Sequence, residues 1–237
     1  MKTISSLLRF VAGFSKTTDS SIWVEKIKEV FGITCHPREP GTPLDSNILR
    51  QVYFILKSVP VLLLKDFGIN NFYFSNTMGK SQPFSPNHGF FYPGDKSITL
   101  NNDIFYHPDI MDDFFDSKGH FLSRPEGTLL HEISHQIDDY LDDISLKPEW
   151  MKLSGWNKEP KPGLKRLFIK GQGGVPDVIG EMYFDPRIAE FTRFYAKRNS
   201  WDDFADSGAY YLGGLKEKVP ATKRKYFDNL LKKYYPA

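Results

Sequence analysis

The chain has 237 residues, of which 40% are hydrophobic and 25% charged, and its formal net charge is only +2. These values are typical of a globular protein with a real core, and they exclude a disordered chain or one with the basic excess of a nucleic-acid-binding protein. The single cysteine, Cys35, excludes an intramolecular disulfide framework and any metal site built from several cysteines.

Membrane association is not expected from the sequence. The most apolar run, residues 59–64, is far shorter than the roughly 20 residues that a membrane helix needs. The first 18 residues predict an amphipathic helix rather than a signal peptide, because Arg9 interrupts their apolar stretch and no small-residue cleavage site follows. We therefore expect a soluble chain without stable membrane insertion, in a compartment that its first residues leave open.

The first 68 residues predict helices, and residues 69–106 predict a small sheet. Residues 20–31 carry apolar side chains at helical spacing. Residues 47–67 predict a second helical stretch that Pro60 kinks or splits, and the prolines between residues 36 and 45 predict a loop before it. Residues 69–75, 89–92 and 97–101 predict strands, the last two joined by a turn.

The second half of the chain predicts more helices. Pro125 and Glu126 suit the first turn of a helix over residues 125–143, and an apolar side chain recurs every four residues from Leu129 to Leu141. Residues 147–180 predict an irregular stretch, in which residues 171–174 form a loop over a cleft; residues 185–195, 201–212 and 226–235 predict helices. No linker divides the chain, so we expect one α+β domain, mostly helical with a small mixed sheet.

The strongest chemical signal is the motif His131-Glu132-Ile133-Ser134-His135 on the predicted helix 125–143. Two histidines four residues apart share a helix face, and both imidazoles can reach one Zn²⁺ ion. Glu132 lies about 100° around the helix from His131, where it can accept a proton from the attacking water rather than ligate the metal. The motif predicts a catalytic zinc site with Glu132 as general base.

A catalytic zinc ion needs a third protein ligand, and no further histidine follows at a useful spacing. The candidates are all acidic: Asp138, Asp139, Asp142, Glu181, Asp185, Glu190, Asp202, Asp203 and Asp206. Asp138 and Asp139 lie one turn beyond His135, so they are better placed to orient an imidazole N–H than to bind the ion.

The longer string His131-Glu-Ile-Ser-His-Gln-Ile-Asp-Asp-Tyr140 is similar to the H-E-x-x-H-x-x-D-D-Y stretch of the anthrax lethal factor catalytic domain and related zincin endopeptidases. The segment from Tyr195 to Asp206 resembles the Y…E-x-F-A-E block of that group. By position, the resemblance implies that Tyr195 stabilises the tetrahedral intermediate, that Asp202 is the third zinc ligand and that Asp206 supports a ligand. Asp replaces Glu at both acidic positions.

The resemblance also implies a zincin-like metalloprotease fold whose edge strand borders the active-site cleft. The strand over residues 97–101 resembles that edge strand, so Ile98, Thr99 and Leu100 are expected to bind an extended peptide by β-addition. The expected protein is a monomeric zinc endopeptidase with one Zn²⁺ ion and a protein or peptide substrate. Because the group includes secreted toxins, the resemblance implies secretion or delivery as an effector.

Two other functions remain open at the level of sequence. One is a binding module that keeps the zincin scaffold without catalysis; the presence of Glu132 argues against it, because a purely structural zinc site does not require that carboxylate. The other is a zinc hydrolase that acts on a non-peptide amide. A peptide-library digest with and without a chelator would distinguish all three.

Overall fold

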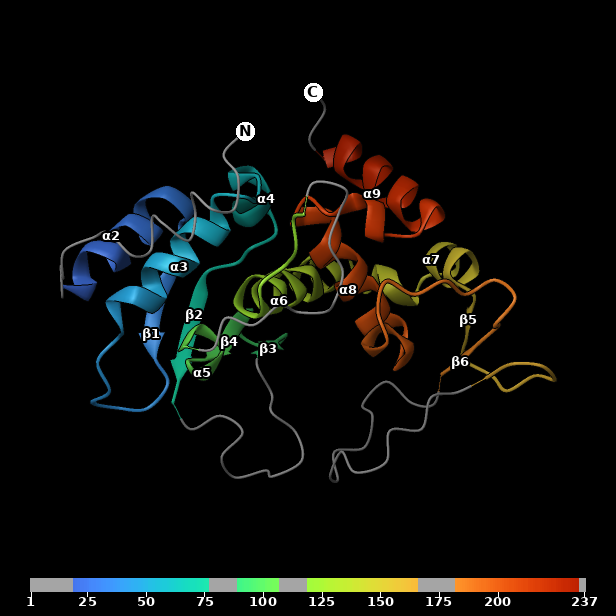
Figure 1. Cartoon of the computed structure of the whole chain (residues 1–237), viewed down its shortest axis with the longest axis horizontal. Helices are drawn as coiled ribbons and strands as arrows, with labels where there is room; N and C mark the ends of the chain where they lie inside the picture. The colour runs from blue at the N-terminus through green and yellow to red at the C-terminus, as the bar shows by residue number, and fades with distance from the viewer. Residues whose placement is uncertain (1–18, 77–88, 107–118, 166–181, 235–237) are drawn as a thin grey trace.

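The computed structural model describes residues 19–76, 89–106, 119–165 and 182–234, and it has the expected α+β architecture, about half helical with a small mixed sheet (Figure 1). The expected N-terminal helix within residues 1–18, the loop at 171–174 and the candidate ligand Glu181 lie outside the described residues. Within the described ranges, no helix has the length and apolar character needed to cross a membrane.

Three helices, α2 (Ser20–Phe31), α3 (Ser46–Leu56) and α4 (Val61–Asp66), precede most of the sheet. The carboxylates of Asp19 and Asp45 cap the first two by accepting backbone N–H groups of the first turn. Pro60 stands immediately before α4, so the expected interruption of the helical stretch 47–67 is confirmed.

The main sheet has four strands in the order β1 (Thr34–Pro37), β2 (Asn71–Ser75), β4 (Ser97–Asn101), β3 (Gly89–Tyr92). The pairs β1–β2 and β2–β4 are parallel, and β3 runs antiparallel to β4. Strand β1 occupies part of the segment predicted to be a loop. The other three strands were expected from the sequence.

The assignment of the edge strand was wrong. Strand β4 lies between β2 and β3, with both of its edges paired, and Ile98, Thr99 and Leu100 are at most 2% exposed. These residues cannot pair with an added peptide strand. The strand at this edge of the sheet is β3.

One face of the sheet forms the core of the molecule. Cys35, Phe72, Ile98 and Phe91 occupy matching positions across the four strands, and all are buried. Together with apolar side chains from the helices they belong to one hydrophobic cluster that extends along the chain from Ile27 to Phe227. The N-terminal helices and the C-terminal helices therefore share a continuous core.

Helix α6 (Arg124–Tyr140), which contains the histidine motif, follows the short helix α5 (Asp103–Tyr106). Pro125 lies in the first turn, as expected, and the hydroxyl of Ser123 caps the N-terminus. The helix ends earlier than predicted, because Asp142 and Asp143 take positive φ angles of 64° and 52°.

The remaining elements are α7 (Pro148–Ser154), the antiparallel pair of strands β5 (Trp156–Asn157) and β6 (Tyr183–Phe184), α8 (Ser200–Leu212), α9 (Ala221–Tyr234) and the short 3₁₀ turns η1 (Ile144–Leu146), η2 (Tyr195–Lys197) and η3 (Lys216–Lys218). Helix α7 was not expected. The predicted helix over 185–195 was wrong, because the Asp185 carboxylate accepts the backbone N–H and the guanidinium N–H groups of Arg187 and forms a turn instead.

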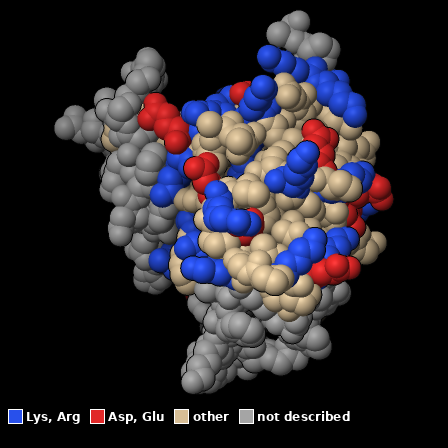
Figure 2. Space-filling view, turned by 90° about the vertical axis from the view of Figure 1, so that its right-hand side faces the viewer, with Lys and Arg blue, Asp and Glu red and all other residues tan. Residues whose placement is uncertain are grey.

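Surface charge follows the near-neutral composition. On the face shown in Figure 2, lysine and arginine side chains of the described residues are interspersed with uncharged surface and acidic side chains. Within α9, Lys223 is only 1% exposed, and its ammonium group is paired with Asp203.

Candidate metal centre

Helix α6 places both motif histidines on one face, where their imidazole rings meet. The Nε2 atoms of His131 and His135 lie 3.0 Å apart, and the ring planes are nearly perpendicular. His131 is buried, and the His135 side chain is 16% exposed. Two ring nitrogens therefore converge on a single point at the edge of the protein interior.

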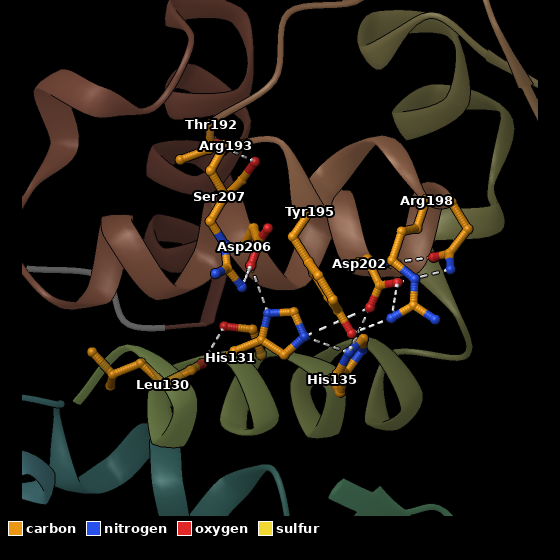
Figure 3. Close-up of polar contacts among 12 residues, drawn as sticks. Leu130, His131, His135, Thr192, Arg193, Tyr195, Arg198, Asp202, Asp206 and Ser207 are labelled. Carbon is orange, nitrogen blue, oxygen red and sulfur yellow. Dashed lines mark hydrogen bonds and ion pairs between the residues drawn. The ribbon is translucent and has the colours of Figure 1, made fainter. Parts of the chain in front are cut away.

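Helix α8 supplies a carboxylate to the same point (Figure 3). The Oδ1 atom of Asp202 lies 3.7 Å from Nε2 of His131 and 3.6 Å from Nε2 of His135. The two helices cross closely enough for this because Gly208 faces Ser134: a Cβ atom at Gly208 would lie 2.8 Å from the Cβ of Ser134. Among the described residues, His131, His135 and Asp202 form a group that could hold a metal ion.

The separations of the three ligand atoms fit a tetrahedral site. Two ligands that each lie about 2.0–2.1 Å from one zinc ion are about 3.3–3.4 Å apart at tetrahedral angles. The three observed separations, 3.0, 3.6 and 3.7 Å, lie on both sides of that value. Small adjustments of side-chain torsions would bring the three atoms around one ion.

Asp206, one turn after Asp202, holds His131 in the orientation that a metal ligand needs. Its Oδ1 atom accepts a hydrogen bond from Nδ1 of His131 at 2.8 Å and another from Nη2 of Arg193 at 2.6 Å. Because Nδ1 donates to Asp206, Nε2 is the ring nitrogen that faces Asp202 and the other histidine and could bind an ion. Burial alone would raise the pKa of Asp206, but the contacts with Arg193 and His131 have the larger effect. The pKa of this carboxyl group is therefore lowered.

The acidic surroundings favour a cation at the histidines. Burial lowers the pKa of His131, but its contacts with Asp202 and Asp206 outweigh that effect and raise the pKa to about 10. The same contacts hold the pKa of the Asp202 carboxyl below its usual range in spite of its burial. A divalent ion would satisfy these carboxylates in place of a proton.

Asp138 does not orient a histidine, contrary to the sequence-based expectation. Its carboxylate accepts hydrogen bonds from the backbone N–H and the hydroxyl of Ser145, at 2.7 and 2.6 Å. The carbonyl of Ser145 in turn accepts a hydrogen bond from the hydroxyl of Ser200, the first residue of α8. Asp138 therefore connects α6 to the start of α8, which carries Asp202, without contacting the imidazoles.

Glu132 lies between α6 and strand β3. Its side chain is buried, and its carboxylate accepts the backbone N–H of Phe91, which lies on β3. The strand approaches so closely that a Cβ atom at Gly89 would lie 2.9 Å from Cγ of Glu132. Burial raises the pKa of Glu132, the direction that makes a carboxylate a better proton acceptor near neutral pH.

Tyr195 extends from η2 toward the histidines (Figure 3). Its ring lies 5.7 Å from the ring of His131, edge to face, and it is flanked by the guanidinium groups of Arg193 and Arg198 at 4.9 and 4.6 Å. Arg198 also donates a hydrogen bond to the phenol oxygen. The structure thus brings together His131, Glu132, His135, Tyr195, Asp202 and Asp206, six of the residues expected from the sequence.

Asp203, an alternative candidate for the third ligand, has a different role. It faces away from the histidines and binds Nζ of Lys223 at 2.6 Å and Nε1 of Trp156 at 2.9 Å. The site is also supported by Arg193, Arg198 and Asn199, which were not expected from the sequence. Only Asn199 has a signal in the sequence, because asparagine is a preferred N-cap and it lies two residues before the predicted helix 201–212.

Comparison of the sequence with models of known protein families finds no match, and comparison with curated proteins finds none either. Conclusions about function therefore depend on the residues of the site itself.

Proposed function

We propose that this chain is a zinc-dependent endopeptidase of the zincin type. The observation that carries the proposal is the convergence of two imidazole nitrogens and one carboxylate oxygen from His131, His135 and Asp202, with Glu132 adjacent. Two nitrogen ligands and one oxygen ligand, with a fourth position left for water or substrate, are the donor set of catalytic zinc.

Zinc bound to these residues would supply Lewis acidity, which lowers the pKa of a water molecule toward about 7 and polarises a carbonyl group. Glu132 would accept the proton of the attacking water and later pass it to the leaving amine. Its carboxylate is held by the N–H of Phe91 and raised in pKa by burial, so it is positioned and basic enough for this role.

Tyr195 would donate its phenol hydrogen to the oxygen that becomes negatively charged in the transition state. Arg198 donates to a lone pair of the phenol oxygen, which leaves the phenol hydrogen to point elsewhere. Burial raises the pKa of Tyr195, so the phenol keeps its hydrogen near neutral pH. A neutral donor at that place stabilises developing charge without binding the uncharged substrate more tightly.

The substrate would bind as an extended peptide along β3 rather than along β4. Among the described strands β3 pairs only with β4, and a peptide strand added to its other edge would compete with Glu132 for the N–H of Phe91. Because Glu132 lies against β3, a peptide added there would have its backbone close to the proton acceptor. Phe90 is 43% exposed, so its ring would contact a side chain of the added peptide.

The first prediction tests the reaction with Glu132→Gln, which keeps an acceptor for the Phe91 N–H but cannot take a proton. We expect the wild-type chain to digest a peptide library and to lose this activity with a chelator. The variant should bind one zinc ion and be at least about 100-fold slower, because general base catalysis is lost. Asp142→Asn is the matched control, since the Asp142 side chain is 94% exposed and outside the site.

Three outcomes would contradict the proposal in different ways. Full activity in Glu132→Gln would remove Glu132 from the reaction. Zinc binding by the wild-type chain without any cleavage would support a binding module. Hydrolysis of small amides but of no peptide in the library would support a hydrolase with a non-peptide substrate.

A further inference from the structure

Asn199, the residue immediately before α8, contacts the proposed third ligand in two ways. Its backbone is extended, with φ −165° and ψ 174°, and its side-chain Oδ1 accepts the backbone N–H of Asp202 at 2.7 Å. This contact is an ordinary N-cap, in which a side-chain oxygen satisfies a free N–H of the first turn.

The second contact is to the side chain of Asp202. The amide nitrogen Nδ2 of Asn199 donates to Oδ2 of Asp202 at 2.9 Å. The orientation of the amide is determined, because a flipped amide would place its NH₂ group against the Asp202 N–H and its oxygen against the carboxylate. One buried amide therefore binds both the backbone and the carboxylate of the same residue.

This arrangement leaves the two carboxylate oxygens of Asp202 in different surroundings. Oδ2 is held by Asn199 and lies 3.6 Å from Nη1 of Arg198. Oδ1 faces the two histidine nitrogens at 3.6 and 3.7 Å. The rotation of the carboxylate about its last torsion is thereby restricted, and one oxygen is presented to the metal position.

We infer that Asn199 is a positioning residue that holds Asp202 as a single-oxygen metal ligand. This role rests on the proposed metal centre, and it explains how a side chain as short as aspartate can serve there. The Asn199 amide holds both the backbone and the carboxylate of Asp202. Both are therefore already in place before the ion binds.

The alternative is that Asn199 is only a helix cap, and Asn199→Asp separates the two roles. Aspartate caps a helix as well as asparagine, so the contact with the backbone N–H of Asp202 is kept. The new carboxylate cannot donate to Oδ2 of Asp202 and repels it, so the orientation of the ligand is lost. Electrostatics alone predicts the opposite change, since an added negative charge near the site attracts a cation.

The experiment is a zinc titration of the full chain against a chelating indicator, for wild type, Asn199→Asp and Asn199→Ser. Serine keeps the cap, adds no charge and does not reach Oδ2 as an amide does. We expect zinc affinity to fall about 10–100-fold in both variants, as for other residues that support metal ligands. The melting temperature of metal-free Asn199→Ser should match the wild type, and the visible spectrum of bound Co²⁺ should change in both variants.

Unchanged or tighter zinc binding by Asn199→Asp, beside a wild-type chain that binds zinc, would overturn the role of Asn199 and leave the metal centre standing. Failure of the wild-type chain itself to bind zinc would overturn the metal centre and this role with it. A lower metal-free melting temperature in Asn199→Ser, together with its loss of zinc affinity, would also overturn the role of Asn199, because it would show a folding defect.

Discussion

Two adjacent aspartates of α8 have opposite surroundings, and this difference decides what each substitution does. Asp202 faces the histidines, whereas Asp203 is fully buried against the ammonium group of Lys223. We expect Asp202→Asn to abolish tight zinc binding. Asp203→Asn should instead lower the free energy of unfolding by about 3–5 kcal/mol, because it leaves a buried ammonium group without its counter-charge.

These two variants can be compared by urea unfolding of the metal-free chain and by zinc titration at the same temperature. Each variant is the control for the other, since the same chemical change is made at neighbouring positions. Weaker zinc binding in a stably folded Asp203→Asn, with normal binding in Asp202→Asn, would reverse the assignment of the third ligand.

Tyr195 gives a prediction about the kinetics of the proposed reaction. Tyr195→Phe removes the hydroxyl and keeps the ring between Arg193 and Arg198. If the hydroxyl acts only in the transition state, kcat should fall by about 10²–10³ while KM stays nearly constant. Tyr211→Phe is a suitable control, since the hydroxyl of Tyr211 binds Asp228. A raised KM with normal kcat would move Tyr195 to substrate binding.

At the scale of elements, helices with an apolar stripe and a proline near one end could be predicted from the sequence. Short strands, and segments that a side chain folds into a turn, could not. Helix α6 is identified by Pro125, Glu126 and its apolar stripe, and Pro60 marks the break before α4. Strand β1 has only four residues and is followed by Arg38 and further prolines, so its pairing with β2 depends on tertiary contacts. The turn at Asp185 has an Asp-Pro sequence that also begins helices.

The candidate site could be predicted as far as its residues follow local periodicity or a motif. His131 and His135 share a helix face by spacing alone, and Asp206 follows Asp202 by one turn. Asp138 satisfies the same spacing rule, but the turn at η1 folds back and Ser145 takes its carboxylate. Likewise, the order of β3 and β4 in the sheet cannot be obtained from their order in the chain, because a hairpin can place either strand at the edge.

The crossing of α6 and α8 depends on the absence of a side chain at Gly208. A methyl group there would overlap the side chain of Ser134, which lies between the two motif histidines. We expect Gly208→Ala to destabilise the fold by about 1–3 kcal/mol through overpacking and to weaken zinc binding by separating the helices. Adding Ser134→Gly removes the opposing side chain and should restore part of the zinc affinity. No recovery in the double variant would show that Gly208 acts through the helix backbone alone.

At the scale of the molecule, the proposed site joins parts of the fold that are distant in sequence. Helix α6 supplies the histidines, α8 the carboxylates, β3 the contact to Glu132, and η2 the phenol. Helix α8 is further tied to α9 through Asp203 and Lys223, and to η1 through Ser200. The positions of the ligand atoms therefore depend on packing among α6, α8, α9, β3 and the turns η1 and η2, and not on the motif helix alone.

Because its ligands come from two helices, a bound metal ion should stabilise the entire fold. A ligand that binds only the folded state adds about 4 kcal/mol when its free concentration is about 1,000 times its dissociation constant. For a chain of this size each kcal/mol raises the melting temperature by about 2–4 °C, so we expect zinc to raise it by about 8–16 °C. Differential scanning calorimetry with buffered zinc and with a chelator measures the effect.

His135→Gln is the control, since it keeps a polar side chain but removes the converging imidazole. An equal rise in this variant would place the stabilising ion elsewhere, whereas a rise confined to the wild-type chain would tie the stabilisation to the ligands carried by α6 and α8.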